Sequence, residues 1–163
     1  MLSDAEMLDF YERSCADVYR YASRLVGGDR ARAEDLVQET YLTLVRQVRV
    51  GRAEAVDVGW AITTCRSRFL DQLRRGRRAE RTAQRSYERA PSTTDRDPTS
   101  TATEALIHLS DSQRAALVLR YVDDLPVADV ANAIGRSLHA TESLLARARD
   151  SLRERYTALG GER

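Results

Sequence analysis

Apolar residues recur at intervals of three and four positions through most of this 163-residue chain, and no segment alternates apolar with polar residues as a half-buried strand does. In the first such segment, one face carries Met7, Tyr11, Val18, Ala22 and Leu25. A chain patterned in this way buries its apolar side chains where helices meet. The sequence therefore predicts an all-α fold.

Residues typical of helix ends frame these segments. Ser3 with Glu6, and Ser110 with Gln113, have the spacing of a capping box, in which two side chains satisfy free backbone N–H groups at a helix start. Asp29 can cap the second helix in the same way. We expect long helices in the first half of the chain, the third running over 60–88, and shorter ones after residue 109.

Residues 91–103, PSTTDRDPTSTAT, contain seven Ser or Thr and two Pro. Such a segment cannot bury enough apolar surface to offset the entropy of ordering it. The sequence therefore predicts two small helical domains, residues 1–90 and 105–163, joined by a flexible linker over 91–104.

Positive charge is concentrated in one part of the chain. The 26 basic residues are all Arg and face 25 acidic ones, but residues 61–90 hold nine Arg against three acidic residues. A local basic patch attracts polyanions even on a neutral protein, so this segment is a candidate nucleic-acid surface, with a solvated helix as the alternative. Trp60 and Phe69 are the aromatic residues near enough to stack on a base, although Trp60 also suits the core.

The last fifty residues contain the spacing of a helix-turn-helix. Ala131 allows two helices to cross closely, Gly135 relieves the turn, and Thr141 packs the second helix on the first. An ordinary helical hairpin is the alternative. If the second helix enters the major groove, the candidates for base edges are Arg136, Ser137, His139, Ala140, Glu142 and Ser143, and those for phosphates are Arg147 and Arg149.

A third candidate surface is acidic. Glu34, Asp35, Gln38 and Glu39 lie opposite the apolar face of the second helix. They indicate either simple exposure to solvent or a docking face for a basic partner.

Enzymatic chemistry has no support in the sequence, which lacks a nucleophile–base pair, a phosphate-binding glycine loop and a cluster of metal ligands. We expect no catalytic residue, metal or cofactor. Cys15 and Cys65 are fifty positions apart and read as buried thiols. No apolar run reaches the ~18 residues of a membrane span and no signal peptide is evident, which predicts a cytoplasmic protein without membrane insertion.

Three motifs in order resemble the extracytoplasmic-function (ECF) sigma factors of bacterial RNA polymerase. The segment AEDLVQETYLTLVR (33–46) is similar to the family's core-binding helix, and WAITTCRSRFLDQLRRGRR (60–78) to the helix after it. LSDSQRAALVLRYVDDLPVADVANAIGRS (109–137) and the final ARARDSLR (146–153) resemble the family's C-terminal domain. The resemblance covers nearly the whole chain.

The resemblance implies a promoter-recognition factor that binds core RNA polymerase and opens promoter DNA. The resemblance implies that the clamp helices of the largest subunit are contacted by Glu34, Asp35, Leu36, Gln38, Glu39 and Leu42. It also implies that the minus-ten element is opened and held by the loop 49–59 and the helix after it, through Trp60, Arg66, Ser67, Asp71, Arg74, Arg75, Arg77 and Arg78. The last helix, with the residues named above, would read the minus-thirty-five element as duplex.

Further partners follow from the same resemblance. The linker would run toward the RNA exit path, the C-terminal domain would meet the flap of the second-largest subunit, and an anti-sigma factor would hold the chain inactive.

Two segments depart from the family pattern. Ser67 stands where the family usually has Asn, and Arg68 and Phe69 replace small or apolar residues. In the recognition helix, His139 to Leu144 read HATESL in place of the family's GTVKSR. Two positive charges are lost and one negative charge is gained, which lowers the expected phosphate affinity. We therefore expect an unusual promoter, or greater reliance on minus-ten contacts.

Two other readings remain open at this point. A stand-alone helix-turn-helix regulator would bind an operator without polymerase, but it leaves the 33–46 motif and the arginine-rich helix unexplained. A helical adaptor without a DNA role would use only the acidic face.

Overall fold

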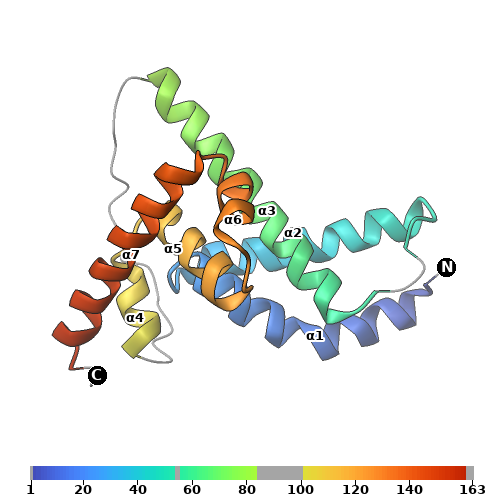
Figure 1. The fold of residues 1–163 in the computed structure, drawn as a ribbon. Coiled ribbons are helices and arrows are strands. Elements are labelled where there is room, and N and C mark those ends of the chain that lie inside the picture. The colour runs from blue at the N-terminus through green and yellow to red at the C-terminus, as the bar shows by residue number, and fades with distance from the viewer. Residues whose placement is uncertain (1, 54–55, 84–100, 161–163) are drawn as a thin grey trace.

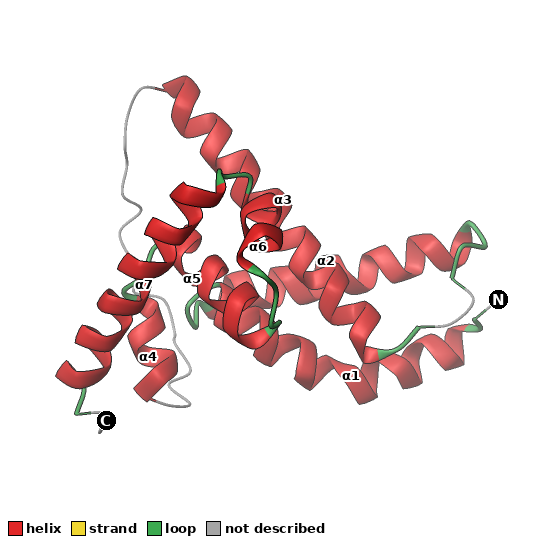
Figure 2. Ribbon diagram, viewed as in Figure 1, coloured by secondary structure: helices red, strands yellow, loops and turns green. Residues whose placement is uncertain are grey.

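The computed structural model describes residues 2–53, 56–83 and 101–160, and these residues form helices and turns with no β-strand among them. All-α architecture is thereby confirmed (Figures 1 and 2). The N-terminal domain consists of α1 (Asp4–Leu25), α2 (Arg30–Arg49) and α3 (Val58–Ala83). The C-terminal domain consists of α4 (Thr101–Ile107), α5 (Asp111–Leu117), a π-helical turn (Val118–Val122), α6 (Val127–Ile134) and α7 (Leu138–Ala158). None of the described helices is both long enough and apolar enough to cross a lipid bilayer.

The N-terminal domain is a three-helix bundle whose core is made by the apolar faces of α1, α2 and α3. Val18 of α1, Leu36 of α2 and Phe69 of α3 are each at most 1% exposed and belong to one cluster of buried side chains. The predicted face of α1 is right except at its start, where Phe10 is buried and Tyr11 is 42% exposed. Tyr11 instead stacks edge-on against Tyr41 of α2, with ring centroids 4.8 Å apart.

Helix starts follow the capping residues read from the sequence. In both predicted capping boxes the Ser hydroxyl accepts from the backbone N–H three residues later. The side chain of Glu6 or Gln113 accepts in turn from the backbone N–H of the Ser. Asp29 accepts from the backbone N–H of Arg32 at 3.1 Å. These contacts involve residues within one turn, which is why the sequence predicts them well.

The C-terminal domain contains the predicted helix-turn-helix. α6 ends at Ile134 and is capped by Gly135, which has φ 69° and ψ 43°; α7 starts three residues after this glycine, at Leu138. That left-handed conformation strains any residue with a Cβ, so glycine suits the turn. Ala131 is 4% exposed and Thr141 is fully buried, as the spacing requires.

Two parts of the C-terminal half differ from the sequence prediction. α4 begins at Thr101, so residues 101–104 are helical where a linker was predicted, because Ala105 is fully buried and anchors this helix on the domain. The rest of that linker and the expected end of the third helix lie outside the described residues. The predicted helix after Ser110 continues as a π-helical turn, and Asp124 beyond it has φ 53°.

The two domains share one continuous core, and a buried arginine lies where they meet. Arg114 of α5 is 5% exposed and donates from Nε to the Leu25 carbonyl at the end of α1, at 3.1 Å. Its other nitrogens reach the Leu109 carbonyl and the Asp111 carboxylate. Burial lowers the pKa of this guanidinium, and the carboxylate opposes that effect. A Cβ at Gly27 would lie 2.9 Å from Arg114, so glycine permits this approach.

Replacing Arg114 with Ala removes a buried charge and leaves buried carbonyls without a donor. We expect the Arg114→Ala variant to lose about 2–4 kcal/mol of unfolding free energy in urea titrations. Arg13→Ala is the matched control, because Arg13 also lies in a helix and pairs with an acid, Asp9, but is 69% exposed. Equal midpoints for the two variants would contradict the structural role of Arg114.

The two thiols should react at different rates. Cys65 is buried, and burial raises its pKa to about 11, whereas Cys15 is half-buried. Because the thiolate is the reactive form, we expect an alkylating reagent at pH 8 to label Cys15 alone in the folded chain and both thiols in urea. Rapid labelling of Cys65 in the folded chain, measured by mass spectrometry, would show that its burial is transient.

Candidate nucleic-acid interface

Five of the six residues predicted to bind core polymerase form an exposed strip along α2. Leu42 is 45% exposed, and the other four are three carboxylates and one amide. We call this strip the α2 acidic face; it consists of Glu34, Asp35, Gln38, Glu39 and Leu42. Leu36 is the exception at 1% exposed, because it points into the bundle, so it supports this face from beneath and offers no side chain to a partner.

Two carboxylates of the α2 acidic face accept hydrogen bonds from neighbouring side chains. Glu34 accepts from Arg30 Nε at 3.0 Å, one turn earlier on the helix. Both carboxylate oxygens of Glu39 lie 3.4 Å from the amide nitrogen of Gln72, which comes from α3. Asp35 and Gln38 project into solvent.

The arginines of α3 fall into two groups. We define the α3 arginine surface as Arg66, Arg74, Arg75, Arg77 and Arg78. Arg75 and Arg78 are exposed, while the other three are half-buried against the C-terminal domain. There, Arg66 pairs with Asp123 at 3.3 Å, Arg74 donates to the Ala133 carbonyl at 2.5 Å and Arg77 to the Ile134 carbonyl at 2.7 Å.

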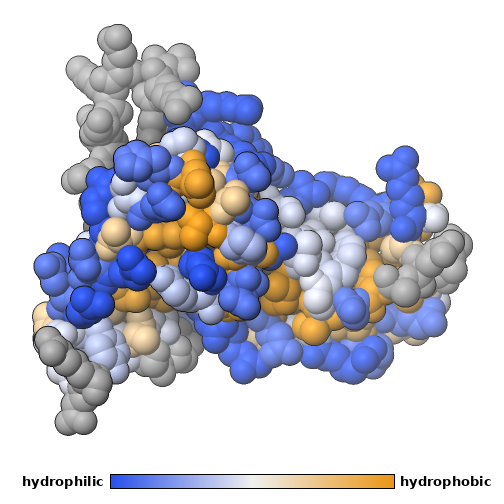
Figure 3. Space-filling model, in the orientation of Figure 1, coloured by the Kyte–Doolittle hydropathy of each residue, from blue (hydrophilic) through white to orange (hydrophobic). Residues whose placement is uncertain are grey.

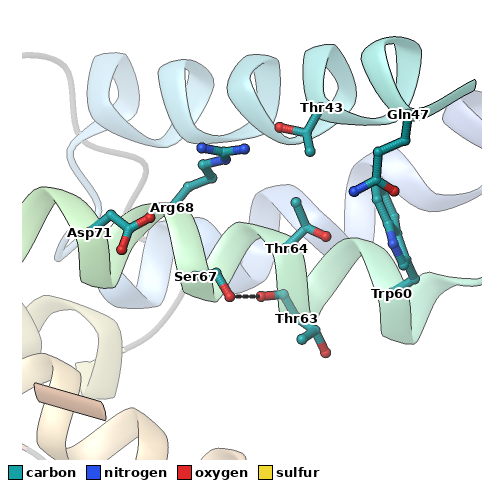
Figure 4. Close-up of a pocket in the computed structure, with 8 residues that line it drawn as sticks. All are labelled: Thr43, Gln47, Trp60, Thr63, Thr64, Ser67, Arg68 and Asp71. Carbon is teal, nitrogen blue, oxygen red and sulfur yellow. Dashed lines mark hydrogen bonds between the residues drawn. The ribbon is translucent and has the colours of Figure 1, made fainter. Parts of the chain in front are cut away.

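A groove of about 500 Å³ lies between α2 and α3, next to the α3 arginine surface (Figure 4). Half-buried Trp60 lies at one end beside Gln47, and Arg68 and Asp71 are at the other. Hydroxyl groups line the middle, and they belong to Thr43, Thr63, Thr64 and Ser67. Such a site offers a ring for stacking together with hydrogen-bond donors and acceptors.

The groove also revises the sequence prediction. Phe69 is 1% exposed and cannot stack on a ligand, whereas Trp60 reaches the groove wall. Ser67, predicted as a minus-ten residue, lines the groove and donates to the Thr63 carbonyl at 3.0 Å. Thr43 and Gln47 had no signal in the sequence, because they join the site only when α2 packs on α3.

The start of α7 is open to solvent on the side predicted to face DNA. His139 and Glu142 are exposed, and Ala140 is half-buried. His139, Ser143 and Arg147 share one side of the helix at four-residue spacing. Ser137 is engaged as the helix cap, since its hydroxyl accepts from the Ala140 backbone N–H at 3.2 Å.

The arginines that flank the helix-turn-helix differ in exposure and in hydrogen bonding. Arg149 is exposed and lies 3.3 Å from the Tyr121 hydroxyl. Arg136, in the turn, has a buried Nε with no hydrogen-bond partner. A buried donor without an acceptor costs free energy, so the turn carries one donor whose hydrogen-bonding capacity is not satisfied.

Comparison with known families and proteins agrees with the division of the chain into two helical domains. Residues 10–79 match the family model Sigma-70 region 2, and residues 101–152 match Sigma-70, region 4. The ECF RNA polymerase sigma factor SigL of Mycobacterium tuberculosis is 30% identical over 163 residues, covering 96% of this chain and 92% of SigL. The ECF sigma factor BldN of Streptomyces coelicolor is 31% identical over 147 residues; the match covers 85% of this chain and 55% of BldN, so the chain spans about half of that relative.

A solved structure has the same fold. The sigma factor RpoE of Bartonella quintana, in complex with the anti-sigma factor NepR, matches with a TM-score of 0.54 at 24% identity, over 90% of this chain and 94% of that one. The region 2 match also accounts for the N-terminal helices that a stand-alone regulator leaves unexplained. With both regions in order and a full-length relative at 30% identity, the chain belongs to the ECF family of RNA polymerase sigma factors, which direct the polymerase to promoters.

Proposed function

We propose that this sigma factor docks on core polymerase through the α2 acidic face, holds the minus-ten element on the α3 arginine surface and reads the minus-thirty-five element with the start of α7. It acts in the cytosol as an initiation factor and not as an enzyme. The groove between α2 and α3 carries the proposal, because it places an aromatic ring and polar side chains on the same helix as the arginines.

In the minus-ten element, the groove would receive an unpaired base of the non-template strand. Trp60 offers a ring face, and the hydroxyls and Arg68 offer hydrogen bonds to base edges. Removing a base from the stack costs a few kcal/mol, which stacking on the indole and phosphate contacts of the arginines would offset. Arg75 and Arg78 are both exposed and would meet the phosphates.

On the polymerase, the α2 acidic face would meet the clamp helices of the largest subunit. Its carboxylates would attract basic side chains of the clamp, and exposed Leu42 would supply apolar contact. Charge complementarity of this kind sets orientation and association rate more than total affinity.

Reversing one charge on the α2 acidic face tests polymerase docking. We expect Asp35→Lys to weaken binding to core polymerase about tenfold and to lower run-off transcription from genomic promoter fragments in proportion. Glu12→Lys makes the same charge change at an exposed position of α1 and should behave as wild type. If both variants bind core equally, docking does not use this face, and if the unaltered chain supports no core-dependent transcripts, the whole proposal fails.

At the minus-thirty-five element, the exposed start of α7 would lie in the major groove. His139 and Glu142 would face base edges, and Arg147 and Arg149 would approach phosphates. Glu142 is exposed and negatively charged, so it opposes binding unless it accepts from a cytosine amino group.

A single substitution in α7 separates these roles. We expect Glu142→Lys to raise the affinity for the minus-thirty-five element several-fold, measured as protection in footprints, without changing which promoters are selected. The slope of log affinity against log salt concentration should steepen by about one, because one more counterion is released. Glu154→Lys is the control, because it makes the same change at an exposed position about three turns further along α7. Unchanged protection in Glu142→Lys would remove this residue from the DNA interface.

Apolar surface on the C-terminal domain favours two further protein partners. Val122 is 49% and Leu138 is 51% exposed, and Figure 3 shows hydrophobic residues gathered over the C-terminal helices. Exposed apolar area of this kind is typical of protein contacts. We assign it to the flap of the second-largest polymerase subunit and to an anti-sigma factor, a partner of the kind present in the RpoE complex.

A further inference from the structure

An exposed tyrosine lies beside one of the arginines that we assign to phosphates at the minus-thirty-five element. Tyr121 belongs to the π-helical turn after α5, and α7 packs against α5 (Figure 1). The Arg149 guanidinium of α7 donates to the Tyr121 hydroxyl oxygen at 3.3 Å. The two side chains therefore form one polar contact at the surface of the C-terminal domain, although 28 positions separate them in the sequence.

The π-helical turn interrupts the helical register at this tyrosine. In a continued α-helix, Tyr121 would follow Val118 by three residues and Leu117 by four, on the side of the helix where both are buried. The turn instead closes from the Asp123 backbone N–H to the Val118 carbonyl, five residues earlier, at 3.0 Å. Tyr121 is 55% exposed, so its hydroxyl is available at the surface. Such π-helical turns are frequent at functional sites.

The donors at this contact point toward solvent. The Tyr121 oxygen accepts from Arg149, and the hydrogen of the same hydroxyl has no acceptor in the described part of the chain. The Arg149 guanidinium is exposed and forms no ion pair with a described acidic residue, so further N–H groups remain for a ligand. A phosphate oxygen is an acceptor that suits both a hydroxyl and a guanidinium.

A second arginine lies next to the tyrosine. The guanidinium carbon of Arg120 is 5.6 Å from the centroid of the Tyr121 ring. Asp124, the exposed acid beyond the turn, pairs with Arg120 at 3.5 Å, so its negative charge is partly offset. An anion that reaches the Tyr121 hydroxyl thus meets guanidinium groups from two sides of the ring.

We infer that Tyr121 and Arg149 together hold one phosphate of the promoter backbone beside the minus-thirty-five element. Tyr121 is a positioning residue: it donates to the phosphate while it accepts from Arg149, and so it orients the guanidinium that binds the same phosphate. A phosphate contact of this kind sets the register of α7 on the duplex and reads no base. The inference rests on the proposed role of α7 at the minus-thirty-five element.

Two variants separate the hydroxyl from the charge. Each is bound to core polymerase and titrated with a duplex promoter fragment that gives a core-dependent run-off transcript. We expect Tyr121→Phe to bind this fragment about fivefold less tightly than wild type with the same salt dependence, because a neutral hydroxyl releases no counterion. Arg149→Gln should also weaken binding, and it should make the slope of log affinity against log salt concentration shallower by about one.

The matched control is Tyr156→Phe. It removes the same hydroxyl from a half-buried tyrosine about two turns beyond Arg149 on α7 and should bind as wild type does.

A methylphosphonate scan identifies the phosphate itself. Each fragment carries one uncharged methylphosphonate in place of a phosphate along the minus-thirty-five element. At one position we expect wild type and Tyr156→Phe to lose about tenfold in affinity and Tyr121→Phe to lose only about twofold, because its bond to that phosphate is already absent. A purely structural role of Tyr121 would lower affinity for every fragment equally and leave the pattern of the scan unchanged.

The remaining outcomes separate the inference from the proposed function. If the scan of Tyr121→Phe equals that of wild type, Tyr121 holds no phosphate and the inference is wrong, while a shallower salt slope in Arg149→Gln keeps α7 at the DNA. If no methylphosphonate weakens binding and Arg149→Gln has the slope of wild type, α7 does not contact the promoter backbone, and both proposals fail.

Discussion

Arginine side chains that donate to the carbonyl ends of helices hold this protein in the observed arrangement. Arg114 of the C-terminal domain binds the end of α1, and Arg74 and Arg77 of the N-terminal domain bind the end of α6. A helix end leaves several carbonyls unpaired, and guanidinium groups supply directed donors that can reach them. Each domain thus completes a helix of the other, and the shared core and the Arg32–Asp111 pair reinforce that connection.

The same chemistry links the architecture to promoter recognition. Guanidinium groups that bind helix carbonyls also suit phosphate oxygens, which are stronger acceptors because they carry full charges. In the function proposed above, a chain whose basic residues are all Arg would use one side-chain type both to join its two domains and to hold DNA. Arg75 and Arg78 are exposed in the observed arrangement, and in the proposed function they would make the first contacts with a polyanion.

Sequence reasoning succeeded where the deciding contacts are local. Ser3, Ser110 and Asp29 cap helices as predicted, and Gly135 adopts the left-handed turn. It is less successful where packing decides. The sequence predicts Leu36 and Phe69 as contact residues, but both are buried, and residues 101–104 are helical because Ala105 anchors them. His139 and Glu142, predicted for α7, are exposed at its start, whereas Thr43 and Gln47 of the groove lining had no sequence signal.

The sequence by itself determined the helices, the two-domain organisation and the family, since these depend on periodicity, caps and motifs within short stretches. Only the tertiary structure decided which arginines donate hydrogen bonds to carbonyls of the other domain. In the sequence Arg74, Arg75, Arg77 and Arg78 are equivalent members of one run, and Arg114 is an ordinary helical residue. Their partners lie 59, 57 and 89 positions away for Arg74, Arg77 and Arg114, and a hydrogen bond over such separations exists only after the helices pack.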